Sequence, residues 1–182
     1  MDDARPQVLV LNGGSSSGKT TLAHCLQDLL DGYWLRLGLD TLIDAAPRTL
    51  FAAGGLAMAD DGTIDPGPDF VEIERQWMAG VGAMAAAGAH ILVEDNFISG
   101  ATAQERWAKA LDGVAVGWIG VRCDPEIAKA REAERVERIA GMAETQAYSV
   151  HEGIVYDLEV DAGRTDPKEL AATVRDHFFP AG

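Results

Sequence analysis

A short stretch near the start of the chain decides the fold. It joins a run of apolar residues to a loop of glycines and serines, and it reads Val8-Leu9-Val10-Leu11-Asn12-Gly13-Gly14-Ser15-Ser16-Ser17-Gly18-Lys19-Thr20. The last eight residues fit the pattern G-x-x-x-x-G-K-[ST] at every fixed position, and residues 19–30 continue with helical periodicity. A buried strand, a glycine-rich loop and a helix in this order predict a phosphate-binding loop (P-loop).

The chemistry of anion binding explains the residue types in this loop. Glycines let the backbone curl so that successive N–H groups point inward, and the helix N-terminus adds its partial positive charge. Lys19 can reach the β- and γ-phosphates of a nucleotide, and the Thr20 hydroxyl can bind Mg²⁺. We therefore expect ATP to bind along the whole loop, at Gly13, Gly14, Ser15, Ser16, Ser17, Gly18, Lys19, Thr20 and Thr21.

Apolar runs alternate with helical patterns along the rest of the chain, which is typical of an α/β fold with a largely parallel sheet. Strands are expected at residues 7–11, 33–39, 91–93, 114–121 and 158–160. Helices are expected at residues 19–30, 70–87, 102–111, 124–137 and from residue 166 onward. Because no linker or repeat interrupts this alternation, residues 1–182 are predicted to form a single P-loop kinase-like domain. Its five mostly parallel strands should be flanked by helices and accompanied by lid segments.

Residues 52–69 differ from the rest of the chain in composition. They hold four glycines, two prolines and the pair Asp61-Gly62, which favours a tight hairpin turn. A glycine-rich insertion near a nucleotide site is either a substrate-side lid or an inert excursion on the surface. The sequence leaves both interpretations open.

Acidic residues follow two of the predicted strands. Ligands of open α/β sheets bind at the carboxyl ends of the strands, and phosphoryl transfer to an alcohol needs a group that accepts the hydroxyl proton. Asp40 is the candidate for this base, and the alternative is an N-cap for a helix at residues 41–46. Asp95 is expected to help hold Mg²⁺ through water, and Glu94 either shares this task or is structural.

Three arginines recur at helical spacing in residues 124–145. Arg131, Arg135 and Arg138 fall within an arc of roughly 60° on one helix face. One interpretation is a lid that closes over the phosphates and stabilises the transferring charge. The other is an exposed helix with salt bridges to its acidic neighbours. His151, beside Glu152, is interpreted as structural rather than catalytic.

The balance of charge narrows the classes of partner. Fifteen basic and 29 acidic residues give a formal net charge of −14, so general binding to nucleic acid or to anionic membranes is not expected. ATP must therefore be held by a local site. The first residues lack the pattern of a signal peptide, and no apolar segment approaches the roughly 20 residues that span a bilayer, so a soluble cytoplasmic protein is expected. Cys25 and Cys123 lack metal-binding spacing and are interpreted as reduced thiols.

Stretches along nearly the whole chain resemble the chloramphenicol phosphotransferases, P-loop kinases of antibiotic-producing actinomycetes. The resemblance begins at the P-loop and includes residues 38–43, 103–107 and 120–124. Its most specific stretches are Ala140-Gly141-Met142-Ala143, Gln146-Ala147-Tyr148, Val150-His151-Glu152-Gly153 and Tyr156-Asp157.

This resemblance implies a kinase fold with a five-stranded parallel sheet. It also implies transfer of the ATP γ-phosphate to the primary hydroxyl of chloramphenicol, which inactivates the drug and confers resistance. The family's proton-accepting aspartate falls on Asp40, its loop lysine and following hydroxyl residue on Lys19 and Thr20, and its lid arginines on Arg131, Arg135 and Arg138. Ser17 stands where alanine is expected, and residues 50–69 match less closely, so another hydroxylated antibiotic or metabolite is an alternative acceptor.

Two other functions compete with this one. A small-molecule kinase for a shikimate-like or nucleoside substrate would share the P-loop and lid but need a polar acceptor pocket, whereas an aryl antibiotic needs an apolar one. A non-catalytic nucleotide-binding switch would lack an acceptor base. The sequence favours a Mg²⁺-dependent O-phosphotransferase that uses ATP on a small-molecule acceptor, and it leaves the oligomeric state open.

Overall fold

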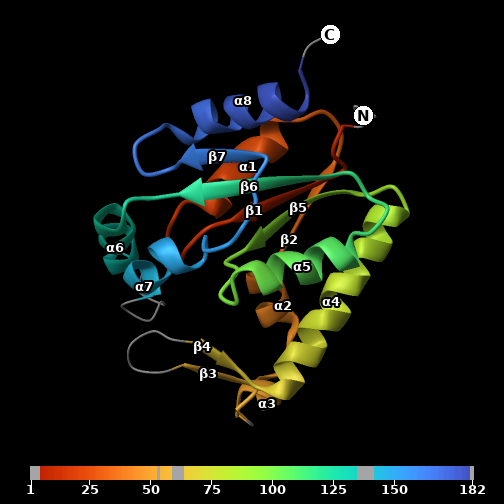
Figure 1. Ribbon diagram of the computed structural model, residues 1–182, viewed down its shortest axis with the longest axis vertical. Coiled ribbons are helices and arrows are strands. Elements are labelled where there is room, and N and C mark those ends of the chain that lie inside the picture. Colours follow the sequence, from red (N-terminus) through yellow and green to blue (C-terminus); the bar gives the residue numbers. More distant parts are fainter. Residues whose placement is uncertain (1–4, 53, 59–63, 135–141, 181–182) are drawn as a thin grey trace.

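A five-stranded sheet, parallel throughout, forms the centre of the protein (Figure 1). The computed structural model describes residues 5–52, 54–58, 64–134 and 142–180. The strand order is β2-β5-β1-β6-β7, which confirms the predicted fold class. The strands are β1 (Val8–Asn12), β2 (Trp34–Gly38), β5 (His90–Asp95), β6 (Val116–Arg122) and β7 (Leu158–Asp161).

Helices cover both faces of the sheet (Figure 1). One face carries α1 (Lys19–Leu29) and α8 (Pro167–Phe178), and the other carries α4 (Pro68–Ala86) and α5 (Ala101–Ala110). Alternate residues of β1 face the two layers, with Leu9 and Leu11 in the first core and Val8 and Val10 in the second. Because both faces are buried, the central strand is an uninterrupted apolar run rather than an alternating one.

A smaller unit follows β2. It consists of α2 (Leu39–Ala45), α3 (Arg48–Ala52) and an antiparallel pair of strands, β3 (Leu56–Met58) and β4 (Ile64–Pro66). Leu42, Leu50 and Phe70 form its core and attach it to the start of α4. The antiparallel pairing agrees with the hairpin expected in this region, although the Asp61-Gly62 pair lies outside the described residues.

The structure differs from the predicted elements near the carboxyl ends of the strands. Glu94 and Asp95 are the last two residues of β5 rather than the first two after it. Helix α2 begins at Leu39, so Asp40 lies in its first turn and Gly38 is the N-cap, which excludes the N-cap role for Asp40. A Cβ atom at Gly38 would lie 2.7 Å from the Glu94 carbonyl oxygen, so this turn requires glycine.

Two further helices lie beside the carboxyl ends of the sheet, α6 (Pro125–Ala133) and α7 (Met142–Ser149). Helix α6 confirms the described part of the helix expected at residues 124–137, and the Asp124 side chain caps it by accepting from the Glu126 N–H. Helices α3 and α7 were not predicted. Their five and eight residues are too few for helical periodicity to show in the sequence.

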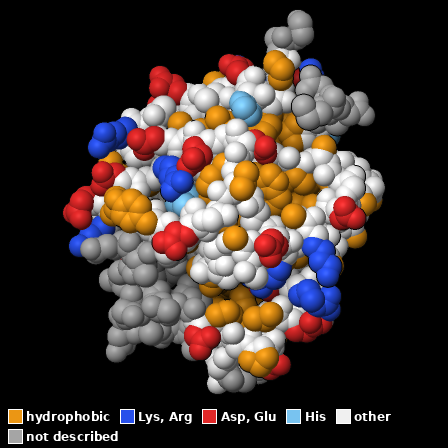
Figure 2. All heavy atoms as spheres, viewed as in Figure 1, with side chains coloured by type: hydrophobic (Ala, Val, Ile, Leu, Met, Phe, Trp, Pro, Cys, Tyr) orange, Lys and Arg blue, Asp and Glu red, His pale blue; other side chains and the backbone are white. Residues whose placement is uncertain are grey.

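The acidic charge is spread over the surface. Figure 2 shows Asp and Glu side chains scattered across the face in view, with Lys and Arg between them. Within the described part of the chain, no helix is both long enough and apolar enough to cross a membrane.

Two glycines of α4 provide a test of how closely α4 and α5 pack. A Cβ atom at Gly82 would lie 2.0 Å from the Ala110 carbonyl oxygen, whereas one at Gly80 meets nothing within 4 Å. We expect Gly82→Ala to lower the free energy of unfolding by about 1–3 kcal/mol. Gly80→Ala, in the same helix, should raise it by about 0.5–1 kcal/mol because alanine has the higher helix propensity. Urea denaturation of both variants measures the difference, and equal effects would contradict the close helix contact.

Candidate active site

The loop between β1 and α1 has the backbone shape of an anion site. Ser16 adopts a φ angle of 57°, in the left-handed region that a non-glycine residue rarely occupies, and Gly18 has a φ angle of 105°. Such conformations turn successive N–H groups toward one centre. Ser15, Ser16 and Ser17 are buried, and all three line the cavity at this loop.

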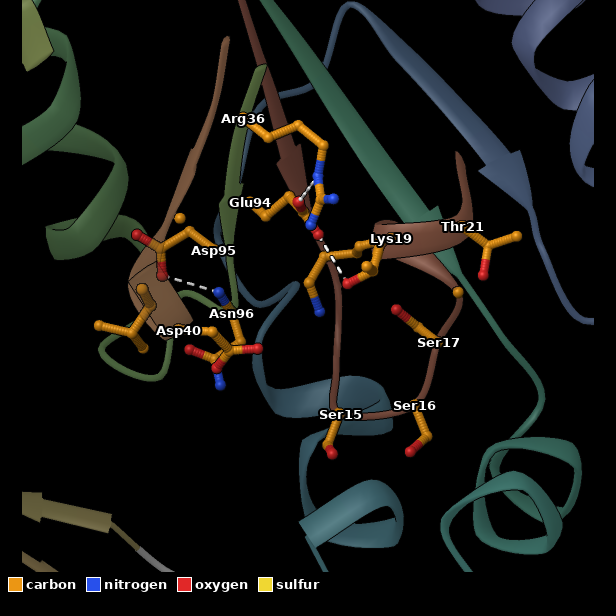
Figure 3. A pocket seen from close by; sticks show the side chains of 14 residues that line it. Ser15, Ser16, Ser17, Lys19, Thr21, Arg36, Asp40, Glu94, Asp95 and Asn96 are labelled. Carbon is orange, nitrogen blue, oxygen red and sulfur yellow. Dashed lines mark hydrogen bonds and ion pairs between the residues drawn. The ribbon is translucent and has the colours of Figure 1, made fainter. Parts of the chain in front are cut away.

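Polar and charged side chains from the loop and from two neighbouring strands meet at the mouth of the loop. The Lys19 ammonium donates hydrogen bonds to the Gly13 and Gly14 carbonyl oxygens at 2.6 and 2.8 Å, inside the curve of the loop. The Thr20 hydroxyl donates to Glu94 Oε2 at 2.7 Å, and Arg36 Nε lies 2.7 Å from the other oxygen of the same carboxylate (Figure 3). Glu94 therefore joins β5 to the first turn of α1.

Asp95 has a different environment from its neighbour. Its Oδ2 accepts a hydrogen bond from Trp107 Nε1 at 2.6 Å, and its Oδ1 accepts one from the Asn96 backbone N–H at 2.7 Å. The residue is only 7% exposed, and burial raises the pKa of its carboxyl group. Asp95 thus lines the same cavity as Glu94, but its carboxylate is bound within the protein rather than to Thr20.

Oxygen ligands suit Mg²⁺, which keeps several waters and usually takes one or two protein groups together with substrate phosphates. Within the described residues, no three His, Cys, Asp or Glu side chains gather into a metal cluster. The adjacent oxygens of Thr20 and Glu94 fit the smaller donor set that a nucleotide-bound metal requires.

Three cavities follow one another along the carboxyl ends of the strands. The central one, of about 220 Å³, is lined by the P-loop from Ser15 to Thr21, by Arg36 and by residues 94–96. A second, of about 460 Å³, shares Leu39, Asp40 and Asn96 with the first. A third, of about 360 Å³, shares Ser16, Gly18 and Thr21 with it. Figure 3 shows Asp40 and Asn96 on the side of the loop away from Thr21, so the outer cavities open from opposite ends of the central one.

The second cavity is predominantly apolar. Seven of its thirteen described lining residues are apolar: Leu39, Ile43, Leu56, Pro66, Phe70, Val71 and Ile98. Glu74 and Arg106 form an ion pair of 2.7 Å within this lining, and Arg106 also donates to the Ser99 hydroxyl at 3.0 Å. Burial raises the pKa of Glu74. Leu56 of β3 and Pro66 of β4 belong to this wall, so the segment at 52–69 borders the second cavity.

Arg131 borders the third cavity, together with Pro167 at the start of α8. Its guanidinium donates to the Ala162 carbonyl oxygen at 2.9 Å and to the Ser17 carbonyl oxygen at 3.3 Å. The structure thus places Arg131 beside the outer wall of the P-loop, at the end remote from Asp40. Arg135 and Arg138 lie outside the described residues, and so does most of the segment that joins α6 to α7.

A network of polar side chains at the end of β1, where the P-loop begins, could not be predicted from the sequence. Asn12, the last residue of β1, donates through Nδ2 to the Val150 carbonyl oxygen at 2.7 Å and to the Tyr156 hydroxyl at 2.5 Å. His151 Nδ1 lies 2.6 Å from the same hydroxyl. Burial, with a smaller effect of the positive charge of Arg122, lowers the pKa of His151 to about 4, and burial raises that of Tyr156 to about 12. Both groups are neutral near pH 7, and their hydrogen bonds connect residues 150–156 to the end of β1.

Comparison with known proteins identifies the family. The family model described as chloramphenicol phosphotransferase-like protein matches residues 6–179, so the chain belongs to this family of ATP-dependent small-molecule kinases. A protein found in two strains of Mycobacterium tuberculosis, named as a candidate O-phosphotransferase, is 28% identical over 189 residues. That alignment covers 94% of this chain and 82% of the relative.

Solved structures share the fold. An unliganded sugar kinase from Janibacter sp. HTCC2649 superposes with a TM-score of 0.66 at 19% identity and covers 96% of both chains. The tunicamycin resistance protein of Deinococcus radiodurans gives 0.67 at 15% identity, over 97% of this chain and 98% of its own. The APS kinase CysC of M. tuberculosis, solved with AMPPNP and APS, gives 0.56 at 18% identity, over 95% and 97%.

The buried, neutral His151 predicts a dependence of stability on pH. Its pKa falls from 6.5 in the unfolded chain to about 4 in the fold, so the unfolded chain binds a proton between these values that the folded protein does not. The contribution of the neutral ring is complete above pH 6.5 and is lost as the pH falls toward 4, by up to roughly 1.4 kcal/mol per pH unit. Relative to His151→Gln, wild-type stability should therefore decline between pH 6.5 and 4.5 in urea unfolding. A stability difference that stays constant over this range would contradict the assignment.

Proposed function

We propose that this member of the chloramphenicol phosphotransferase-like family transfers the γ-phosphate of ATP to a hydroxyl of a small, largely apolar antibiotic, with chloramphenicol and its primary hydroxyl as the acceptor we favour. The observation that carries the proposal is the series of three cavities, with the P-loop in the middle and Asp40 at the border of the apolar one. ATP fills the central cavity and the third cavity, beside Arg131, and the acceptor fills the second, apolar cavity.

The residues that the central cavity shares with each outer cavity support one direction for the bound nucleotide. Its triphosphate lies over the P-loop N–H groups and Lys19, and its base and ribose extend past Thr21 into the cavity beside Arg131 and Pro167. The γ-phosphate then points toward Asp40. In this arrangement Arg131 binds the nucleotide, and stabilisation of the transferring phosphoryl group falls to Lys19 and to lid residues.

Thr20 and Glu94 are the groups that would hold Mg²⁺, in place of the Asp95 expected from the sequence, because their oxygens already meet at the mouth of the loop. A Mg²⁺ ion held by these two residues would supply positive charge that offsets the negative charge of the β- and γ-phosphates. Arg36 donates to the remaining oxygen of Glu94 and so holds that carboxylate in position. Asp95, bound to Trp107, holds the end of β5 in place.

Asp40 is proposed as the acceptor base. An acceptor hydroxyl at the border of the two cavities can give its proton to the Asp40 carboxylate while its oxygen bonds to the γ-phosphorus. The bond between the γ-phosphorus and the bridging oxygen of the β-phosphate breaks, and ADP leaves. The products are ADP and the phosphorylated alcohol, which has lost the hydroxyl it needs to act as a drug.

The lining of the second cavity supports this class of acceptor. Aliphatic side chains and Phe70 suit the ring of an aryl antibiotic, whereas a polyol such as shikimate would need polar groups on all sides. A relative that acts on another hydroxylated antibiotic or metabolite would use the same Asp40 and P-loop. We place this reaction in the cytoplasm, where ATP is available. Its proposed biological role is resistance to the antibiotic.

ATP consumption with and without chloramphenicol, followed by mass spectrometry of the drug, tests this function. We expect consumption that depends on chloramphenicol and a drug mass increased by one phosphate. No phosphorylation of the drug by protein that binds ATP would contradict chloramphenicol as the acceptor.

Asp40→Asn tests the base in the same assay. We expect kcat to fall by roughly 10²–10⁴-fold with nucleotide affinity unchanged, since the asparagine amide cannot accept the proton. Asp44→Asn is the matched control, because Asp44 lies on the same helix, is exposed and lines none of the three cavities. Turnover by Asp40→Asn close to that of Asp44→Asn would remove Asp40 from the role of base.

A further inference from the structure

A single side-chain oxygen connects the nucleotide loop to the acceptor side of the site. Gln146 Oε1 accepts a hydrogen bond from the Ser15 backbone N–H at 3.0 Å and a longer one from Asn96 Nδ2 at 3.4 Å. Gln146 is only 4% exposed. Ser15 belongs to the P-loop, whereas Asn96 lines both the phosphate cavity and the acceptor cavity.

The position of Gln146 is set by backbone packing. A Cβ atom at Gly14 would lie 3.2 Å from the carbonyl carbon and oxygen of Gln146, so α7 lies directly against the loop. Four residues later, the Val150 carbonyl oxygen accepts from Asn12 Nδ2 at 2.7 Å. The segment that carries Gln146 is thereby attached to the end of β1 and to the loop.

Phosphate binding changes which groups donate hydrogen bonds to Gln146 Oε1. Ser15 lines the phosphate cavity, so a phosphate bound there can compete with Gln146 for the Ser15 N–H, and a charged phosphate oxygen is a stronger acceptor than an amide oxygen. A phosphate that takes this N–H leaves Gln146 Oε1 with Asn96 Nδ2 as its donor. The contact of 3.4 Å can then shorten and orient the Asn96 carboxamide, whose Oδ1 is buried without a partner among the described residues.

We propose that Gln146 is a positioning residue that couples nucleotide binding to acceptor binding through Asn96. The inference rests on the proposed function, because it takes the cavity beside Asn96 as the acceptor site. Coupling of this kind requires a contact that differs between the two states, and the competition for the Ser15 N–H supplies one. With nucleotide bound, the Asn96 carboxamide is held ready beside Asp40 and the acceptor binds more tightly.

Gln146→Met separates this role from a structural one. Methionine keeps the length of the side chain but removes the oxygen that competes with phosphate for the Ser15 N–H. We therefore expect AMPPNP to bind more tightly to the variant while the acceptor loses its benefit from bound nucleotide. Damage to the packing of α7 against the loop would instead weaken binding of both ligands.

Calorimetry supplies the test, with AMPPNP and Mg²⁺ as the nucleotide probe and chloramphenicol as the acceptor probe. In the wild type, saturating AMPPNP should lower the Kd of chloramphenicol by at least about 5-fold, at the lower end of typical coupling. In Gln146→Met this factor should fall to near 1, and Asn96→Val should lose it in the same way. Gln104→Met is the control, since Gln104 bonds to the Val155 backbone and lines none of the three cavities.

The outcomes separate this inference from the proposed function. A Gln146→Met variant that keeps the coupling, or that binds AMPPNP more weakly, overturns the inference while wild-type binding of chloramphenicol upholds the function. If the wild type binds no chloramphenicol beside AMPPNP, the proposed acceptor fails. The AMPPNP affinity of Gln146→Met then decides the inference, with tighter binding in its favour and weaker binding against it.

Discussion

The parallel pairing of β1 with β5 and β6 is the constraint on which the site depends. Its register sets Asn12 opposite both Asp95 and Gly120, so the carboxyl ends of three neighbouring strands finish at one edge. The P-loop leaves β1 at this edge, and Glu94 of β5 meets Thr20 there. Residues separated by more than 70 positions in the chain thus meet at one site.

Much of this arrangement is predictable because it follows from short-range patterns. Residues 8–20 carry the strand, the turn chemistry and the helix start in one continuous segment, so the P-loop could be located from its own residues. The central strand β1 was found because it is an apolar run buried on both faces. The edge strands β2 and β7 are only partly buried, and their shorter apolar stretches still marked them. Asp40 could be singled out because it follows one of these strands, although the helix that holds it starts two residues earlier than expected.

The parts that could not be predicted depend on contacts between distant segments. Glu94 and Asp95 are adjacent carboxylates, and the sequence favoured Asp95 for the metal. Only the packing of Trp107 against the end of β5 shows that Asp95 is bound inside the protein while Glu94 faces Thr20. Gln146 lies in a stretch that resembles the family, but its contacts are with Gly14 and Ser15, more than 130 residues away, and no local pattern predicts them. Arg131 likewise looks like a lid residue by its spacing, and its distance from Asp40 appears only in the fold.

The positive charge that attracts phosphates is confined to the site itself. A chain of formal charge −14 repels polyanions overall, yet the backbone donors of the loop, Lys19 and Arg36 converge where the phosphates must lie. The neighbouring second cavity, in contrast, has a mainly aliphatic and aromatic lining. A site that is charged at one end and apolar at the other suits a reaction that joins a phosphate to an apolar alcohol, and Asp40 lies where the two environments meet.

A crystal structure of the protein with AMPPNP, Mg²⁺ and chloramphenicol tests this arrangement most directly. We expect the nucleotide base beside Arg131 and Pro167 and the γ-phosphate above Lys19. We also expect the primary hydroxyl of the drug within hydrogen-bonding distance of the Asp40 carboxylate, with its ring among Ile43, Phe70 and Ile98. A drug bound elsewhere, or a γ-phosphate directed away from Asp40, would contradict the central claim that transfer takes place at the border of these two cavities.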